Sequence, residues 1–473
     1  MTGAGERVLL VDFGSTFTKL TAVETGAPRL LGNAQAPTTV AQGIMLGFRA
    51  ALDKLTALTG LGLGDFARTL VASSAAGGLR MVAVGLVPEL TVEAARRAAL
   101  GAGAKLLGGF AYELIPDDLE RMAALSPDLI LLAGGTDGGN KEVILHNAAV
   151  LARSRLTAPI IVAGNRCVAP EVLRVLSEGG KEARVTENVM PELDQLNVEP
   201  ARRAIRALFL ERIIEAKGLE AVRDLAGGQV IPTPAAVLQA AELLARGLPG
   251  EPGFGDLMVI DPGGATTDVH SLSKGEPTRP NVAWKGLPEP FAKRTVEGDL
   301  GLRVSAVAAV EAVGEERLRR LMNDPTYPAA ERAATLAKAT EALPEDARDR
   351  AFDLALARAC VELAVSRHAG RLETLYTPMG VSYLQKGKDL TGLKVVIGTG
   401  GPIIRAADPA WVLAGACFDP AEPDLLRPEH PDLLLDRDYL LSGLGLLAEH
   451  DPQAALRLAK LHLTPCPAPT RPA

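Results

Sequence analysis

An acidic residue at the end of an apolar run marks the first stretch of this sequence that suits phosphate chemistry. The apolar residues 8–11 predict a buried strand that leads to Asp12, and Gly14 follows in a turn. Three hydroxyls and one ammonium come next, on Ser15, Thr16, Thr18 and Lys19. Backbone N–H groups of such a turn form an anion-binding concavity, and a carboxylate can hold Mg²⁺ through water. The stretch predicts a polyphosphate site, with an ordinary edge hairpin as the alternative interpretation.

The same order of residues returns in the second part of the sequence. The apolar run 257–260 again leads to an acid, Asp261. A glycine turn and two hydroxyls follow it, at Gly263, Gly264, Thr266 and Thr267. The repetition strengthens the phosphate interpretation, because an accidental polar turn has no reason to occur twice in the same arrangement.

A third turn has glycines without an acid. The apolar residues 395–397 lead to Gly398, Thr399, Gly400 and Gly401. Such a turn lets the backbone come close to a flat neutral group such as adenosine. Two acid-bearing loops and one glycine loop therefore predict ATP or ADP, with Mg²⁺, held between two similar halves.

These residues also predict roles in hydrolysis. Asp12 and Asp261 would hold Mg²⁺ through water, and Asp261 or Glu297 would orient the attacking water. Glu297 flanks Gly298 together with Asp299, and a charged surface turn is the alternative interpretation of that segment. Lys19 would neutralise phosphate, unless it is a solvent-facing strand lysine.

The elements that must position these loops alternate between strand and helix. Residues 128–186 predict a β-α-β-α-β unit with parallel strands. The glycine-rich loops at 73–78 and 134–140 would contact a nucleotide or a partner, or would only connect elements. Helical periodicity is found over residues 43–58, 335–343 and 350–372. The segment 247–255, GLPGEPGFG, predicts a linker between the halves.

Composition narrows the class of protein. A chain of 473 residues predicts more than one domain, and a net charge of −7 disfavours a nucleic-acid partner. The four cysteines form no CxxC pair, which predicts free thiols in a reducing compartment. No apolar run approaches the ~18 residues that a membrane span needs, so we expect a cytoplasmic protein. The sequence also contains no P-loop, no H-E-x-x-H motif and no cobalamin-binding DxHxxG motif.

The order of the three loops resembles the phosphate-1, phosphate-2 and adenosine motifs of the actin, Hsp70 and sugar-kinase superfamily. Longer stretches resemble the GlmL/MutL family, over residues 73–91, 131–140, 294–303 and 388–402. The resemblance implies an α/β fold with two actin-like (ribonuclease H-like) ATPase halves around a nucleotide cleft. With the linker as the boundary, we expect the first half at 1–250 with a βαβ insertion around 128–190 and the second at 256–463. The proline-rich composition of 464–473 predicts a disordered tail.

That family accompanies adenosylcobalamin-dependent mutases such as glutamate mutase and ornithine aminomutase. The resemblance therefore implies an ATP-dependent accessory protein, which acts as a chaperone that reactivates such a mutase. Two alternatives stay open: a small-molecule kinase of the same superfold, and a nucleotide-sensing scaffold that does not hydrolyse ATP.

Overall fold

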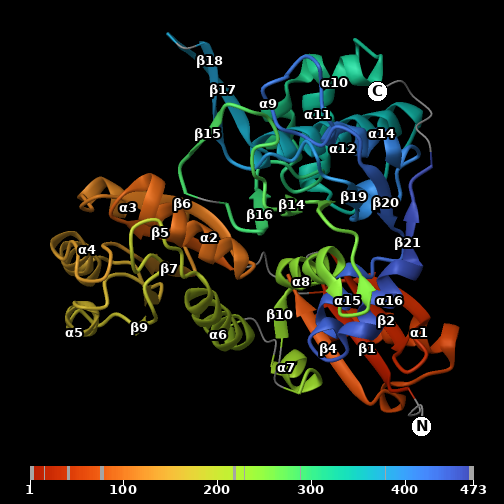
Figure 1. Cartoon of the computed structure of the whole chain (residues 1–473). Coiled ribbons are helices and arrows are strands. Elements are labelled where there is room, and N and C mark those ends of the chain that lie inside the picture. Colours follow the sequence, from red (N-terminus) through yellow and green to blue (C-terminus); the bar gives the residue numbers. More distant parts are fainter. Residues whose placement is uncertain are drawn as a thin grey trace.

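The computed structural model describes most of the chain. The described residues are 5–14, 16–39, 43–74, 79–216, 220–227, 230–287, 289–378 and 380–467. Ser15 and residues 75–78, which belong to two of the expected loops, lie outside them. Figure 1 shows two sheets stacked one above the other and a separate α/β unit beside them.

The first sheet is mixed, in the order β10-β4-β1-β2-β3. It contains β1 (Arg7–Phe13), β2 (Phe17–Glu24), β3 (Arg29–Pro37), β4 (Arg68–Ser73) and β10 (Val230–Pro232). The first three strands are antiparallel neighbours, whereas β4 runs parallel to β1 and β10 runs parallel to β4. Helix α1 (Ile44–Thr59) connects β3 to β4 and buries Phe48, Ala51 and Leu55 against the sheet.

The second sheet repeats this arrangement. It contains β16 (Ala292–Glu297), β14 (Thr267–Leu272), β13 (Leu257–Pro262), β19 (Val395–Gly398) and β20 (Asp432–Asp436) in that order, with β21 (Leu463–Pro465) added at the edge. Strands β13, β14 and β16 are antiparallel neighbours, and β19 and β20 run parallel to β13. Since strand order and directions are the same in both sheets, the predicted pair of actin-like, ribonuclease H-like halves is confirmed.

A helical layer covers the outer face of the second sheet. It is made of α9 (Ala306–Val313), α10 (Glu315–Met322), α11 (Ala329–Lys338), α12 (Ala347–His368), α13 (Gly401–Ile404) and α14 (Pro409–Leu413). The predicted helix at 350–372 is confirmed except at its end, because β17 already begins at Arg371. The helix predicted at 335–343 has the wrong bounds. Helix α11 begins at Ala329 and ends at Lys338, and the chain beyond it is irregular.

A third sheet is inserted between β4 and β10, which are neighbours in the first sheet. Its strands are all parallel, in the order β6-β5-β7-β8-β9. They are β5 (Arg80–Gly85), β6 (Lys105–Ala111), β7 (Leu129–Leu132), β8 (Ile160–Val162) and β9 (Ala183–Val185). The predicted inserted unit is therefore present, and its sheet also takes in β5 and β6, which precede residue 128.

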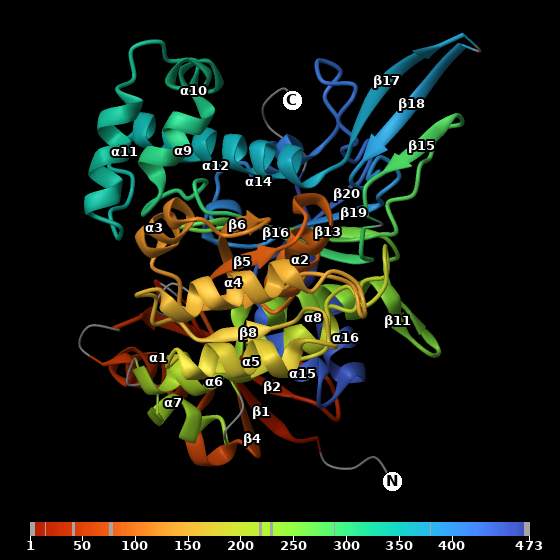
Figure 2. The same ribbon diagram turned by 90° about the vertical axis from the view of Figure 1, so that its left-hand side faces the viewer.

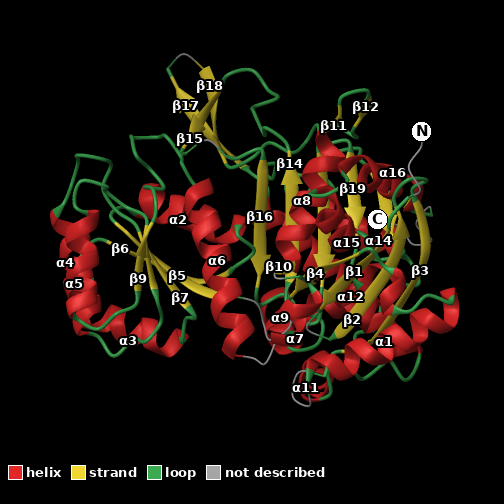
Figure 3. Cartoon of the chain, turned by 90° about the horizontal axis from the view of Figure 1, so that it is seen from below, coloured by secondary structure: helices red, strands yellow, loops and turns green. Residues whose placement is uncertain are grey.

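Helices flank the inserted sheet, as Figure 3 shows. They are α2 (Glu93–Gly101), α3 (Pro116–Leu125), α4 (Glu142–Arg153), α5 (Ala169–Glu178) and α6 (Glu199–Ala216), and the short helix α7 (Glu220–Leu225) follows α6. A π-helical turn at Pro88–Val92 leads directly into α2. Helix α2 lies between the inserted sheet and β16 of the second half. The inserted unit is thereby in contact with the part of the chain that carries the second acid-bearing loop.

The layer between the two actin-like sheets is helical. Helices α8 (Thr233–Arg246), α15 (Leu441–Ala448) and α16 (Pro452–His462) share one core with residues of β1, β13 and β19. The C-terminal helices therefore join both halves. The segment predicted as a linker contains a short hairpin of two antiparallel two-residue strands, β11 (Gly247–Leu248) and β12 (Glu251–Pro252). The domain limits at 250 and 463 stay predictions.

A three-stranded ribbon projects from the second half, as Figure 2 shows. It consists of β15 (Val282–Lys285), β17 (Arg371–Thr377) and β18 (Gly380–Lys386). Tyr376 near its tip is 86% exposed. Among the described residues, no helix is both long enough and apolar enough to cross a membrane.

Candidate functional site

The two acid-bearing loops fold into the same turn. The N–H of Gly14 donates to the carbonyl of Phe17 at 3.0 Å, and the N–H of Gly263 donates to the carbonyl of Thr266 at 2.7 Å. Each turn joins two antiparallel strands of its sheet, β1 to β2 and β13 to β14. The repeated sequence pattern therefore has a structural cause, since the two turns are equivalent positions of two similar halves.

The glycine loop lies directly against the second acid-bearing loop. Thr399 donates its N–H to the carbonyl of Ile260 at 3.0 Å. Gly400 has φ +81°, and a methyl group there would collide with a carboxylate oxygen of Asp261 and with the carbonyl of Pro262. Glycine is required at this position both for the backbone angle and for the close approach.

All three loops border one cavity of about 620 Å³ that lies between the halves. The predicted residues that line it are Asp12, Gly14, Thr16, Lys19, Asp261, Gly263, Gly264, Thr266, Thr399, Gly400 and Gly401. The remaining lining comes mainly from β14, β16, α8, α15 and the segment before α12. This volume lies within the usual range of pockets for cofactors and other small molecules.

Four predicted residues do not border this cavity. Thr18 is fully buried and shares a hydrogen bond with Thr38, whereas buried Thr267 donates to the carbonyl of Leu300 at 2.6 Å. Gly398 ends β19 and packs against the side chains of Ile403 and Leu413. Glu297 is the fourth, and Ser15 lies outside the described residues.

Glu297 belongs to an ion-paired group at the end of β16. Nη1 of Arg367 lies 2.7 Å from Glu297 and 2.8 Å from Asp299. Burial raises the pKa of Glu297, although the guanidinium of Arg367 opposes this effect. Because Thr267 is the strand partner of Glu297, the group lies beside the second acid-bearing loop and outside the cavity.

Asp12 is held by the helical layer between the sheets. Its Oδ1 accepts a hydrogen bond from Thr233 at 2.6 Å, at the start of α8. Its Oδ2 accepts one from Ser442 of α15 at 3.2 Å. Two helices from distant parts of the chain thus orient this carboxylate at the floor of the cavity.

A third strand-end carboxylate, which the sequence interpretation missed, borders the same cavity. Asp436 ends β20 and accepts hydrogen bonds from Thr399 and from the N–H groups of Leu440 and Leu441, at 2.9, 2.8 and 3.2 Å. The signal was present, because residues 433–435 are an apolar run that leads to an acid, as at Asp12 and Asp261. Asp436 ties the glycine loop to the start of α15.

Asp261 is one of the strongly perturbed groups in the cavity. Burial, followed by the negative charges of Asp268, Asp12 and Asp436, raises its pKa to about 7, and Lys19 opposes this. Its carboxylate accepts no hydrogen bond from the described part of the chain. An excess of carboxylates around an unpaired acid is the donor chemistry that suits Mg²⁺ bound through water, so Asp12 and Asp261 fit a metal ion.

Several cations that the sequence did not indicate line the cavity as well. Arg294 pairs with Asp268 at 2.6 Å, and Arg303 pairs with Asp353 at 2.7 Å. The predicted Lys19 lies over the ring of Tyr439, 4.2 Å from its centroid. Arg294 belongs to β16 and Arg303 lies between β16 and α9, and no local motif marks either residue. The cavity therefore combines acids that suit a metal with cations that suit phosphate.

Comparison with known proteins gives the family. A relative named Protein MutL, from Clostridium tetanomorphum, is 49% identical over 455 residues, which cover 96% of this chain and 98% of the relative. Among solved structures, a nucleotide-free acetone carboxylase is 14% identical with a TM-score of 0.38, covering 94% of this chain and 70% of the other. A glycerol dehydratase reactivase is 9% identical with a TM-score of 0.32, covering 94% and 99%. Both scores lie below 0.5, so these two likenesses carry no argument.

The family assignment rests on the sequence over almost the whole length. The model of a family described as MutL protein matches residues 8–463, a range that contains all three loops and the inserted sheet. Together with the relative at 49% identity, this match shows that the chain belongs to the MutL protein family.

Proposed function

We propose that this chain binds and hydrolyses ATP with Mg²⁺, and that it uses this activity to reactivate an adenosylcobalamin-dependent mutase. The observation that carries the proposal is the convergence of three loops, separated by more than a hundred residues each, on one cavity between two similar halves. Family membership supports the mutase as the partner.

The nucleotide would lie across the cavity, with its phosphates at the two equivalent turns. The N–H groups of Gly14 and Gly263 close the two turns, so the backbone N–H groups of Thr16, Gly264 and Ala265, with the hydroxyls of Thr16 and Thr266, would bind the phosphates. Asp12 and Asp261 would hold Mg²⁺ through water, and the metal would neutralise charge on the phosphates. Gly400 and Gly401, beside Thr399, would bracket the adenosine.

Asp261 is the residue we assign to the attacking water. Its carboxylate borders the cavity between the two phosphate turns, where an attacking water would lie. Its carboxylate is also free of internal hydrogen bonds within the described residues, so it can accept one from water. Glu297 fits this role less well, because Arg367 occupies it.

The partner is inferred from kinship. The family accompanies adenosylcobalamin-dependent mutases such as glutamate mutase and ornithine aminomutase, and this sequence has no DxHxxG motif with which to hold a cobalamin itself. Opening and closing of the cavity between ATP and ADP forms would supply the motion that releases a damaged corrinoid from the mutase.

The proposal is tested by ATP turnover with the purified chain and a cobalamin-dependent mutase from the same organism. Turnover that rises with the mutase, and that Asp261→Ala abolishes, would support it. Turnover only with an added sugar or acid would identify a kinase. Binding of ADP without turnover would identify a scaffold, and an Asp261→Ala protein with an unchanged rate would refute the role of Asp261.

A further inference from the structure

Among the described residues, the inserted unit borders the cavity at one short segment, which contains Gly103 and Lys105. Residues 100–105 connect α2 to β6, and Gly103 within them has φ +91°. A methyl group at Gly103 would lie 2.7 Å from Cβ of Pro232, the last residue of β10 in the first half. On its other side the segment contacts Arg294 of β16, in the second half. The segment is thus wedged between both halves at the border of the cavity.

Arg294 connects this segment to the second acid-bearing loop. Its Nη1 donates to the carbonyls of Leu100 and Ala104 at 3.1 and 3.2 Å. Its Nε donates to Asp268 at 2.8 Å, and Asp268 in turn accepts from the hydroxyl of Thr266 at 3.2 Å. A continuous set of hydrogen bonds therefore runs from the inserted unit to the turn that we assign to phosphate.

Lys105, at the end of the same segment, extends its side chain into the cavity lining. A methyl group at Gly298 would lie 2.6 Å from Nζ of Lys105, so the ammonium rests on that glycine. Ser305 donates to the carbonyls of both Gly298 and Ala265 at 3.0 and 2.7 Å, which places Gly298 beside the second acid-bearing turn. The inserted unit thus presents a cation at the phosphate end of the cavity.

This cation differs from three others that line the cavity. Arg294 and Arg303 each have a carboxylate partner, and Lys19 lies on the ring of Tyr439. Within the described residues, the side-chain ammonium of Lys105 makes neither a hydrogen bond nor an ion pair within 4 Å. Its nearest anionic influence is Asp299, whose pKa is lowered mainly by hydrogen bonds with Arg367 and to a lesser extent by the charge of Lys105. A half-buried ammonium gains most from an anionic partner, and a phosphate group supplies one.

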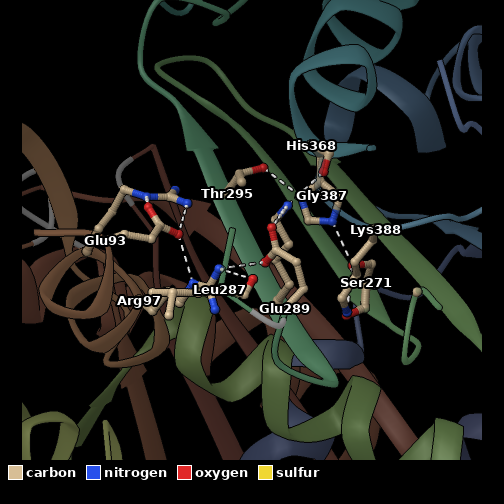
Figure 4. Close-up of polar contacts among 12 residues, drawn as sticks. Glu93, Arg97, Ser271, Leu287, Glu289, Thr295, His368, Gly387 and Lys388 are labelled. Carbon is tan, nitrogen blue, oxygen red and sulfur yellow. Dashed lines mark hydrogen bonds and ion pairs between the residues drawn. The ribbon is translucent and has the colours of Figure 1, made fainter. Parts of the chain in front are cut away.

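The position of the segment is fixed by a cluster of buried charges, shown in Figure 4. Arg97 of α2 pairs with Glu93 at 2.8 Å and with Glu289 of the second half at 3.5 Å. Lys293 pairs with Glu289 at 3.1 Å and donates to the carbonyl of His368 at 2.9 Å. Because these groups are nearly buried, the cluster holds α2 against the second half in one arrangement.

We infer that Lys105 is a ligand of the terminal phosphate, so that the inserted unit itself distinguishes ATP from ADP. This inference rests on the proposed function, because it requires a nucleotide in the cavity. When the terminal phosphate is present, Lys105 binds it and the segment 100–105 is held to the second acid-bearing turn. After hydrolysis and release of phosphate, Lys105 loses its partner, and the link through Arg294 remains.

The test compares nucleotide affinities of the full chain by titration calorimetry, with Mg²⁺ and either a non-hydrolysable ATP analogue or ADP. Loss of one charge-assisted contact predicts that Lys105→Met weakens binding of the analogue roughly tenfold to hundredfold. Binding of ADP changes less than about twofold, because ADP lacks the group that Lys105 contacts. Lys105→Gln repeats the result with a polar side chain, and Lys105→Arg restores most of the affinity. Lys141→Met, at an exposed lysine of the inserted unit, is the matched control and leaves both affinities unchanged.

The outcomes separate this inference from the proposed function. If wild-type chain binds the analogue and ADP, but the Lys105 variants weaken both equally or neither, Lys105 does not contact the terminal phosphate and this inference alone is overturned. If wild-type chain binds neither nucleotide, the proposed function fails and the inference fails with it.

Discussion

Replacing Asp261 by asparagine should stabilise the protein at neutral pH while it removes activity. Burial and three neighbouring carboxylates raise the pKa of Asp261 to about 7 in the folded chain. The unfolded chain has an ordinary aspartate with a pKa of about 3.9. The folded state therefore disfavours the ionised form, which asparagine cannot adopt. Asparagine also keeps the shape of the side chain, and no hydrogen bond to another described residue is lost.

The sign and size of the effect follow from the two pKa values. Below about pH 4 the carboxyl is protonated in both states, and its titration costs nothing. Between about pH 4 and pH 7 the unfolded chain releases the proton and the folded chain keeps it, so the free energy of unfolding falls as pH rises. A pKa difference of about 3 corresponds to an upper limit of about 4 kcal/mol. Because the carboxylate borders the cavity and water screens it, we expect about 1–2 kcal/mol above pH 7.

The assay is urea unfolding of the nucleotide-free chain, followed by circular dichroism at about pH 5 and about pH 8. Asp261→Asn should exceed wild type in stability at the higher pH and by a smaller margin at the lower pH. Asp53→Asn, at an exposed position of α1, should match wild type at both. The reasoning is refuted if Asp261→Asn is equal to wild type at both pH values, or less stable at the higher one.

Three further changes test other parts of the site. Gly400→Ala should destabilise the chain by about 1–3 kcal/mol and abolish nucleotide binding, because its methyl group collides with Asp261, whereas Gly392→Ala in open space should change stability by less than about 0.5 kcal/mol in thermal unfolding. Asp436→Ala should cost about 2–3 kcal/mol in urea unfolding, since three hydrogen-bond donors lose their acceptor, and a smaller loss would show that water replaces it. Glu289→Gln should cost about 2–4 kcal/mol, because it leaves two buried cations without their shared partner, while Glu373→Gln at an exposed ion pair should cost less than about 1 kcal/mol.

The fold was readable from the sequence because its signals are local. An apolar run that leads to an acid and then to a glycine turn specifies the start of each actin-like half, and both halves form as expected. Parallel strands alternating with helices likewise revealed the inserted unit. Strand β6 escaped notice, since residues 105–111 contain two glycines and no alternation of apolar and polar side chains.

The site was readable only in part, for two physical reasons. Neighbouring residues of a strand point to opposite faces, so Lys19 reaches the cavity while Thr18 is buried on the other side, and a list of hydroxyls does not reveal this. Contacts between distant segments leave no local trace. Lys105 and Arg294 come from different domains, and only the folded chain brings them to the same cavity. Asp436 differs from these residues, because its apolar run 433–435 and its acid are a local pattern in the sequence.

The placement of the inserted unit has a consequence for how the polypeptide reaches its native state. Strands β4 and β10 are adjacent in the first sheet, yet roughly 150 residues separate them in the chain. Closing so long an unstructured loop is entropically costly. The contacts of β10 with β4 cannot form until that loop has closed. If the inserted unit collapses first, its own core brings the two ends of the loop together before the first sheet is complete. On the ribosome, the insert would then be the nucleus around which the first actin-like half assembles. Mutations in the cluster confined to the insert, for example at Val172 or Leu176, should then slow folding of the first sheet, which lies outside that cluster.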